Sequence, residues 1–109
     1  MLSATADQSI RFEHKDGDTY ADFPNAPGVL DVLVNNEAST IPATIHRIVD
    51  GASAPIAGLY VFRFDGSTLS FGDRVTILYR WDDVMGNPQD REVSDTVCAR
   101  ADVGRAVGI

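Results

Sequence analysis

Two β-strands are predicted by one stretch of the sequence, GLYVFRFDGSTLSFGDRVTILYRW (residues 58–81). Apolar and polar side chains alternate in its second half. One face carries Val75, Ile77, Tyr79 and Trp81, and the other carries Arg74, Thr76 and Arg80, with Leu78 as the single exception. A period of two among β-branched and aromatic residues is typical of a half-buried antiparallel strand. The first half, LYVFRF, is apolar on both faces over part of its length, which predicts a strand buried on both sides.

The segments on either side of this stretch follow the same pattern. Further extended segments are expected at residues 8–13, 19–23, 29–34, 40–50 and 91–100, and a brief one at 69–71. They are separated by turn residues, Asp16-Gly17-Asp18, Asn35-Asn36 and Asp65-Gly66-Ser67 among them. About seven or eight short strands with frequent turns predict an all-β fold, a single antiparallel β-sandwich. A small β-barrel has the same alternation and is the alternative.

The length of 109 residues fits one domain with one hydrophobic core. Residues 1–7 are interpreted as an N-terminal arm, residues 8–98 as the β-sandwich, and residues 99–109 as a tail with apolar side chains. Two interpretations of the tail stay open. It closes its own sandwich as a last strand, or it adds a strand to the open sheet edge of a neighbouring subunit.

The charge of the chain argues against two kinds of partner. The formal net charge is −7 and the isoelectric point lies near 4.5, whereas proteins that bind nucleic acid need a basic face. An anionic membrane surface is disfavoured for the same reason, and no apolar run is long enough to span a bilayer.

Residues 1–15 lack the pattern of a secretory signal, and the single cysteine, Cys98, allows no intrachain disulfide. Both observations fit a reducing compartment such as the cytoplasm.

The titratable residues show no catalytic or metal-binding pattern. His14 and His46 are far apart, neither has a metal-ligand spacing, and His46 is expected to face solvent. Cys98 has no local signature of a partner base and is interpreted as a small buried hydrophobe. Aspartates gather in the predicted turns, where carboxylates could bind Ca²⁺, although Asp is also favoured in turns for local reasons. We therefore expect no catalytic residue, no cofactor, no metal ligand and no enzyme activity.

The aromatic residues are interpreted mainly as core. Strand positions that pair across a sheet are occupied by Tyr60, Phe62, Phe64 and Tyr79. Aromatic rings at such positions supply much of the buried area. Trp81 stands at the end of its strand and is expected to be partly exposed. The candidate partner-binding residues are therefore Trp81 and the apolar tail residues Val103, Val107 and Ile109.

Residues 58–96 resemble the closing strands of bacterial and phage immunoglobulin-like domains. In such domains an aromatic strand, here GLYVFRF, leads through LSFGDRVTILYRW into a turn, here Asp83–Asn87. The chain departs from antibody-type domains, because it lacks paired cysteines and has its only tryptophan late in the sequence. The chain is also similar to small accessory proteins of tailed phages. This resemblance implies a non-catalytic virion component, such as a capsid decoration, head–tail joining or tail protein.

The same resemblance implies the partners and the location of the chain. The partners would be other protein subunits, in a homo-oligomer or a larger assembly, and the protein would reside in a virion assembled in the host cytoplasm. A stand-alone carbohydrate- or calcium-binding β-sandwich that uses Trp81 and the acidic loops is the alternative. A small enzyme is the least supported class, because no nucleophile–base pair or metal constellation can be identified.

Overall fold

The computed structural model describes residues 7–97, and these residues form strands, turns and loops without a helix. The strands are β1 (Gln8–Glu13), β2 (Lys15–Asp16), β3 (Thr19–Tyr20), β4 (Gly28–Val34), β5 (Glu37–Ala38), β6 (Ala43–Val49), β7 (Pro55–Phe64), β8 (Arg74–Asp82) and β9 (Pro88–Thr96). The prediction of an all-β fold is confirmed. Residues 7–97 contain nine strands rather than seven or eight, and the two that were not expected, β2 and β5, are short pairings of two residues each.

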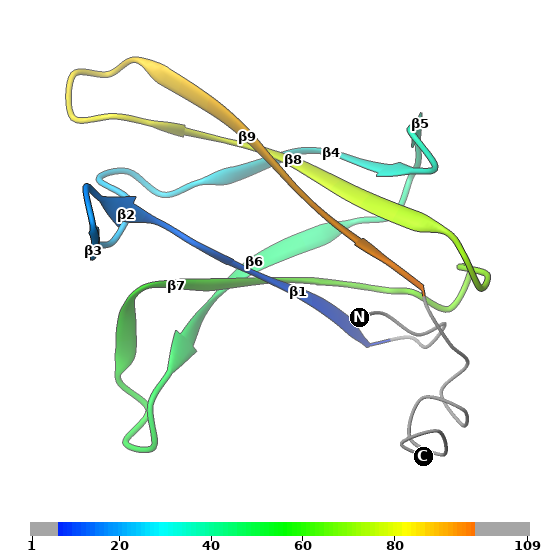
Figure 1. Ribbon diagram of the computed structural model, residues 1–109, viewed down its shortest axis with the longest axis horizontal. Helices are drawn as coiled ribbons and strands as arrows, with labels where there is room; N and C mark the ends of the chain where they lie inside the picture. The colour runs from blue at the N-terminus through cyan, green and yellow to red at the C-terminus, as the bar shows by residue number, and fades with distance from the viewer. Residues whose placement is uncertain (1–6, 98–109) are drawn as a thin grey trace.

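The strands form three antiparallel sheets (Figure 1). One sheet has the order β1-β7-β6, another has the order β5-β4-β8-β9, and β2 pairs with β3 as a small hairpin. The two larger sheets lie over one another in a sandwich-like arrangement, in which β1 approaches β9 and β4 approaches β6. Because the described strands stay in separate sheets, they do not close into a barrel, and the barrel alternative is wrong for residues 7–97.

The alternation predicted for residues 74–81 is confirmed in β8 except at Thr76. Val75, Ile77 and Tyr79 are buried between the sheets, while Arg74 and Arg80 are exposed. Thr76, on the face of the two arginines, is also buried, and its hydroxyl lies 2.9 Å from that of Ser94. This strand has neighbours on both sides, β4 and β9, so it lies inside its sheet.

The core is built from aromatic rings of both larger sheets. The rings of Phe12 on β1 and Phe62 on β7 are stacked, with centroids 4.1 Å apart, and Tyr79 on β8 reaches Phe62 at 5.4 Å. The contact between Phe62 and Tyr79 joins one sheet to the other. The buried cluster comprises Ile10, Phe12, Phe23, Val32, Tyr60, Phe62, Phe64, Leu69, Val75, Ile77, Tyr79 and Val97. The prediction that Tyr60, Phe62, Phe64 and Tyr79 are core residues is confirmed.

The brief strand expected at residues 69–71 does not form. Two consecutive turns occupy the segment, in which the Leu69 amide donates to the carbonyl of Gly66 and the Asp73 amide to that of Ser70. The Asp73 carboxylate accepts a hydrogen bond from the Ser70 amide at 2.8 Å, which holds the second turn and lowers the pKa of Asp73. Aspartate side chains that bond to nearby amides offer the backbone an alternative to a sheet ladder, and here they win.

The start of the last strand and the burial of Val49 also differ from the prediction. The last strand starts at Pro88 rather than Arg91, because β8 and β9 pair as far as Asp82 and Pro88 and leave only a short turn. The alternation in residues 40–50 predicts Val49 on the same face as Ile41, Ala43 and Ile45. Val49 is instead exposed, because the pairing of β6 with β7 shifts register after Arg47. A bulge of this kind turns the following side chain to the other face. The N-terminal arm up to residue 6, Cys98 and the tail 99–109 lie outside the described residues.

Candidate interaction surface

A cluster of three aromatic rings, Trp81, His14 and Phe23, lies at one end of the sandwich. Trp81 lies near the C-terminal end of β8, His14 follows β1, and Phe23 belongs to the loop between β3 and β4. The ring centroids of His14 and Trp81 are 4.8 Å apart in an edge-on arrangement, and those of His14 and Phe23 are 4.4 Å apart. Phe23 and Trp81 are separated by 5.3 Å. Trp81 is thus packed on its neighbours but only partly buried, as the sequence predicted.

Backbone hydrogen bonds fix His14 in this cluster. Its amide donates to the carbonyl of Gly58 on β7 at 2.9 Å, and its carbonyl accepts from the Ala21 amide at 3.2 Å. Its Nδ1 lies 2.8 Å from the carbonyl oxygen of Ala21. A carbonyl can only accept, so Nδ1 carries the proton, and in the neutral imidazole Nε2 is the acceptor nitrogen. His14 is therefore a positioned wall of the cluster rather than a solvated surface residue.

Shallow hollows surround the Trp81 indole, which lines three of them among the described residues. The largest of the three has a volume of about 390 Å³, and its lining combines apolar walls with carboxylates. A second, of about 290 Å³, lies towards Arg91 and is also lined by His14 and Tyr79. Burial raises the pKa of the Tyr79 phenol, so this hydroxyl stays protonated at neutral pH.

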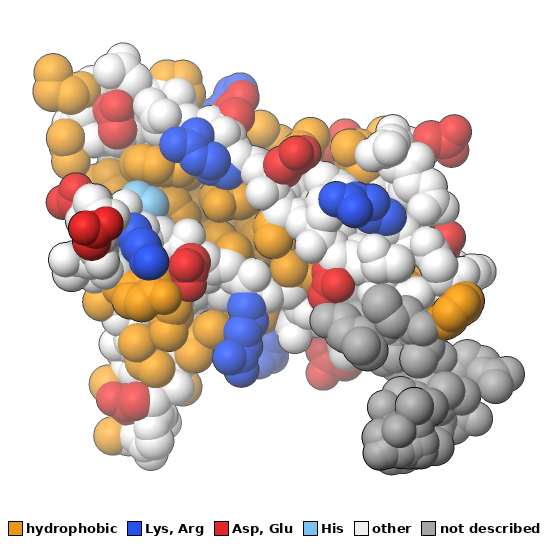
Figure 2. Space-filling view, viewed as in Figure 1, with side chains coloured by type: hydrophobic (Ala, Val, Ile, Leu, Met, Phe, Trp, Pro, Cys, Tyr) orange, Lys and Arg blue, Asp and Glu red, His pale blue; other side chains and the backbone are white. Residues whose placement is uncertain are grey.

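Large apolar side chains are exposed at the same end of the molecule. Val84 and Met85 stand at the tip of the β8–β9 hairpin and are 83% and 80% exposed. Figure 2 shows hydrophobic side chains gathered at this end, over the part of the molecule where Figure 1 places β2, β3 and the β8–β9 turn. We call Trp81, Val84 and Met85, with His14 and Phe23 behind them, the Trp81 surface.

The β8–β9 turn is held in one shape by Asp83. One carboxylate oxygen of Asp83 accepts hydrogen bonds from the amides of Met85 and Asn87, both at 2.9 Å. The Asp83 amide donates to the Asn87 carbonyl, and Gly86, with φ of 83°, donates to the Asp83 carbonyl. These hydrogen bonds hold the backbone of the turn in one conformation. Val84 and Met85 are therefore exposed by an ordered turn.

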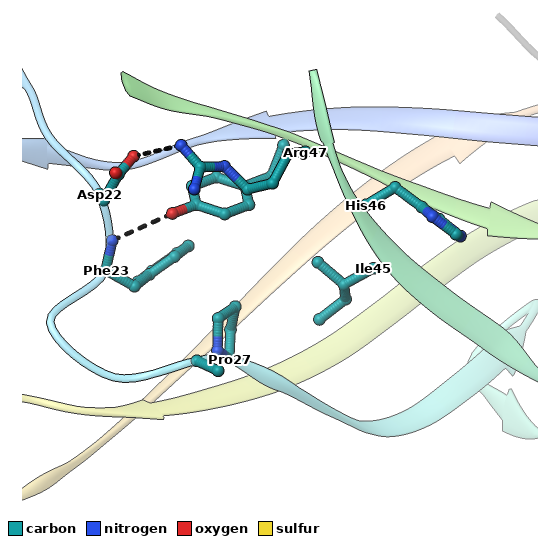
Figure 3. A pocket seen from close by; sticks show the side chains of 8 residues that line it. Asp22, Phe23, Pro27, Ile45, His46 and Arg47 are labelled. Atoms are coloured by element: carbon teal, nitrogen blue, oxygen red, sulfur yellow. Dashed lines mark hydrogen bonds and ion pairs between the residues drawn. The ribbon is translucent and has the colours of Figure 1, made fainter. Parts of the chain in front are cut away.

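A second cluster ties the loop of residues 21–27 to β7 (Figure 3). One carboxylate oxygen of Asp22 accepts from Arg47 Nη2 at 2.6 Å and from the Gly58 amide at 3.0 Å. The Arg47 guanidinium lies 4.9 Å from the ring centroid of Tyr60, whose hydroxyl accepts from the Phe23 amide. An aromatic ring and a carboxylate thus hold the Arg47 side chain, which is 35% exposed, against the sheet.

Replacing Asp22 by alanine is expected to lower the free energy of unfolding by about 1–2 kcal/mol, because it removes an ion pair and leaves the Gly58 amide without its acceptor. Urea denaturation followed by circular dichroism measures this loss. The matched control is Asp90→Ala, which breaks the equally close but more exposed ion pair to Arg80 and no backbone hydrogen bond. A loss for Asp90→Ala as large as that for Asp22→Ala would show that the Gly58 hydrogen bond contributes nothing.

The other sequence-predicted residues fall in different places. His46 is exposed, as expected, and its Nε2 lies 2.7 Å from the Thr44 hydroxyl. Val103, Val107 and Ile109 are outside the described residues, as is Cys98. Residues 7–97 contain no group of three or more His, Cys, Asp or Glu side chains placed to hold a metal ion.

His14 was not predicted to belong to the Trp81 surface. Its position was available from the alternation of β1, because Ile10 and Phe12 point to the core and His14 is the next residue in the same phase.

No helix in residues 7–97 is long and apolar enough to cross a membrane. No protein family, curated protein or solved structure matches this chain.

Proposed function

We propose that this protein is a non-catalytic structural protein that acts through contacts with other protein subunits. Its proposed setting is the virion of a tailed phage, where it would be a capsid decoration, head–tail joining or tail protein assembled in the host cytoplasm. An immunoglobulin-like β-sandwich is the proposed form of the fold. The observation that carries the proposal is the pair of large apolar side chains, Val84 and Met85, presented by an ordered turn beside Trp81.

Apolar exposure of this kind supports a contact function. Scattered exposed hydrophobic residues are common on folded proteins, but a group of them at one end of a molecule marks a surface that other macromolecules cover. Here the group includes an aromatic ring, and aromatic residues and methionine are enriched in protein interfaces. Because the turn is already ordered, a partner would bury Val84 and Met85 without having to order the loop.

The function is tested by the solution mass of the full-length chain over a wide range of concentration. We expect a discrete oligomer, and we expect the double variant Val84→Ser/Met85→Ser to dissociate at least tenfold more readily, since about 1.4 kcal/mol of lost burial gives that factor. Light scattering measures both. A chain truncated after Arg100 tests the proposed contribution of Val103, Val107 and Ile109 in the same experiment.

The control for this experiment is Phe71→Ser. Phe71 is 69% exposed, but it precedes β8, so the length of that strand separates it from the β8–β9 turn. This variant should associate like the unaltered chain. A chain that stays monomeric at all concentrations would contradict self-assembly. An oligomer that resists both the double substitution and the truncation would place the contact elsewhere.

A further inference from the structure

The largest hollow beside Trp81 combines features that recognise a positive charge. Trp81, Pro24, Ala21 and Val84 supply apolar walls, and the acidic residues Asp16, Asp22 and Asp83 also line it. Aromatic faces attract cations through the ring quadrupole, and a nearby carboxylate adds a direct ionic contact.

The charges around this hollow leave it negative. Asp22 is neutralised by Arg47 at 2.6 Å, whereas Asp16 is exposed on the β2–β3 hairpin. Asp83 uses one carboxylate oxygen to hold its own turn, and its second oxygen accepts a long hydrogen bond from Gln89 Nε2, at 3.4 Å. The rim also includes Lys15, whose Nζ lies 4.8 Å from the centroid of the Tyr20 ring. With two carboxylates beside one lysine and a net charge of −7 on the chain, a cationic ligand is favoured over an anionic one.

The neighbouring cluster shows how this chain accommodates such a group. Arg47 places its guanidinium over the Tyr60 ring and donates to Asp22, so an aromatic face and a carboxylate hold one arginine. Asp22, Arg47 and Tyr60 line one hollow, shown in Figure 3, and Asp22 also lines the hollow beside Trp81. The Trp81 hollow offers a similar pair of groups, an indole and the Asp16 carboxylate, and none of the described residues that line it is an arginine.

We propose that the hollow between Trp81, Asp16 and Asp83 receives an arginine side chain of a partner protein. This inference rests on the proposed contact function and names the chemistry of the partner. Arginine suits the site better than lysine, because its planar guanidinium stacks on an aromatic ring while its edge bonds to a carboxylate. The Trp81 surface would then combine an apolar contact by Val84 and Met85 with an ionic anchor.

The test uses Trp81 as its own reporter, since it is the only tryptophan in the chain. Capped arginine amide is titrated into the full-length protein while the indole fluorescence is recorded, and capped citrulline amide serves as the neutral control of the same shape. We expect a saturable change with arginine, a weaker one with lysine amide and none with citrulline. The arginine effect should decrease as salt is added.

Two matched variants assign the effect to the site. Asp16→Asn removes a rim carboxylate and should weaken the binding of arginine amide roughly twofold to fivefold. Asp18→Asn changes a residue of the same hairpin that does not line the hollow and should bind like the unaltered chain. An equal response to arginine and citrulline, a response that does not saturate, or equal binding by the two variants would overturn the inference. Because the light-scattering experiment uses no arginine probe, loss of association in Val84→Ser/Met85→Ser would then still support the contact function.

Discussion

Replacing Gly58 by alanine is expected to destabilise the protein by about 2–4 kcal/mol, through backbone strain and a steric clash together. Gly58 has a φ of +76°, in the left-handed region that residues with a Cβ rarely adopt. A Cβ at this position would lie 2.5 Å from the carbonyl oxygen of His14 and 2.8 Å from the amide nitrogen of Ala21. Both are backbone atoms, so no side-chain rotation relieves the contact. Urea denaturation of the two proteins measures the difference.

The effect of this substitution should extend to the Trp81 surface. Gly58 accepts a hydrogen bond from the His14 amide and donates one to Asp22, so the end of β1 and the loop of residues 21–27 meet on it. Moving these segments apart shifts His14 and Phe23, whose rings pack on Trp81. We therefore expect a change in the indole emission of folded Gly58→Ala as well as a lower denaturation midpoint.

Gly17→Ala separates the two causes. Gly17 also has a positive φ, of +66°, but a Cβ there would meet no atom within 4 Å. This variant should show the conformational cost alone, about 1 kcal/mol, and no change in the emission of Trp81. If Gly58→Ala costs no more than Gly17→Ala, the close approach of the three segments at Gly58 does not contribute to stability.

The alternation of apolar residues predicted the strands that form the centre of the fold. In residues 59–64 and 75–81 the buried face contains the residues that the sequence indicates, because a period of two follows directly from strand geometry. The paired asparagines 35 and 36 were also assigned correctly to a turn, and both adopt the left-handed conformation, with φ of 53° and 68°. Local chemistry decides these features, so a single sequence contains them.

Features that depend on pairing between distant segments could not be predicted. Gly58 reads only as the start of an apolar run, and its restriction arises because β1 and the loop of residues 21–27 both pack on it. Residues 69–71 have an apolar pattern that suits a strand, but the carboxylate of Asp73 competes for the backbone amides. The register shift after Arg47, which exposes Val49, likewise depends on β7.

The candidate surface was predicted in part. Trp81 was singled out because it ends a strand, and the turn at Asp83–Asn87 was recognised from its residues. The exposure of Val84 and Met85 was not predicted. Apolar side chains in a turn are buried or exposed according to the hydrogen bonds that shape the turn. Here the Asp83 carboxylate accepts hydrogen bonds from two backbone amides of the turn, and the turn that they hold leaves both side chains exposed. The meeting of His14, Phe23 and Trp81 requires three segments to converge, which local patterns do not specify.

Replacing Phe62 by alanine is expected to lower the free energy of unfolding by about 3–5 kcal/mol, the range for a buried phenylalanine removed from a close-packed core. Phe62 is 0% exposed and lies in the middle strand of its sheet, opposite Ile10 of β1 and Ile45 of β6. Its ring stacks on Phe12 at 4.1 Å and contacts Tyr79 in the facing sheet at 5.4 Å. The cavity left by alanine would thus weaken both sheets and the contact between them.

Chemical denaturation monitored by circular dichroism measures this loss, and two further variants interpret it. Phe62→Leu keeps most of the apolar volume and should cost about 1.5 kcal/mol or less, which leaves a measurable protein if Phe62→Ala fails to fold. Phe71→Ala removes a ring that is 69% exposed and should change stability little. A Phe62→Ala protein as stable as Phe71→Ala would contradict the packing described for the two sheets, because a ring that joins them cannot be removed without loss.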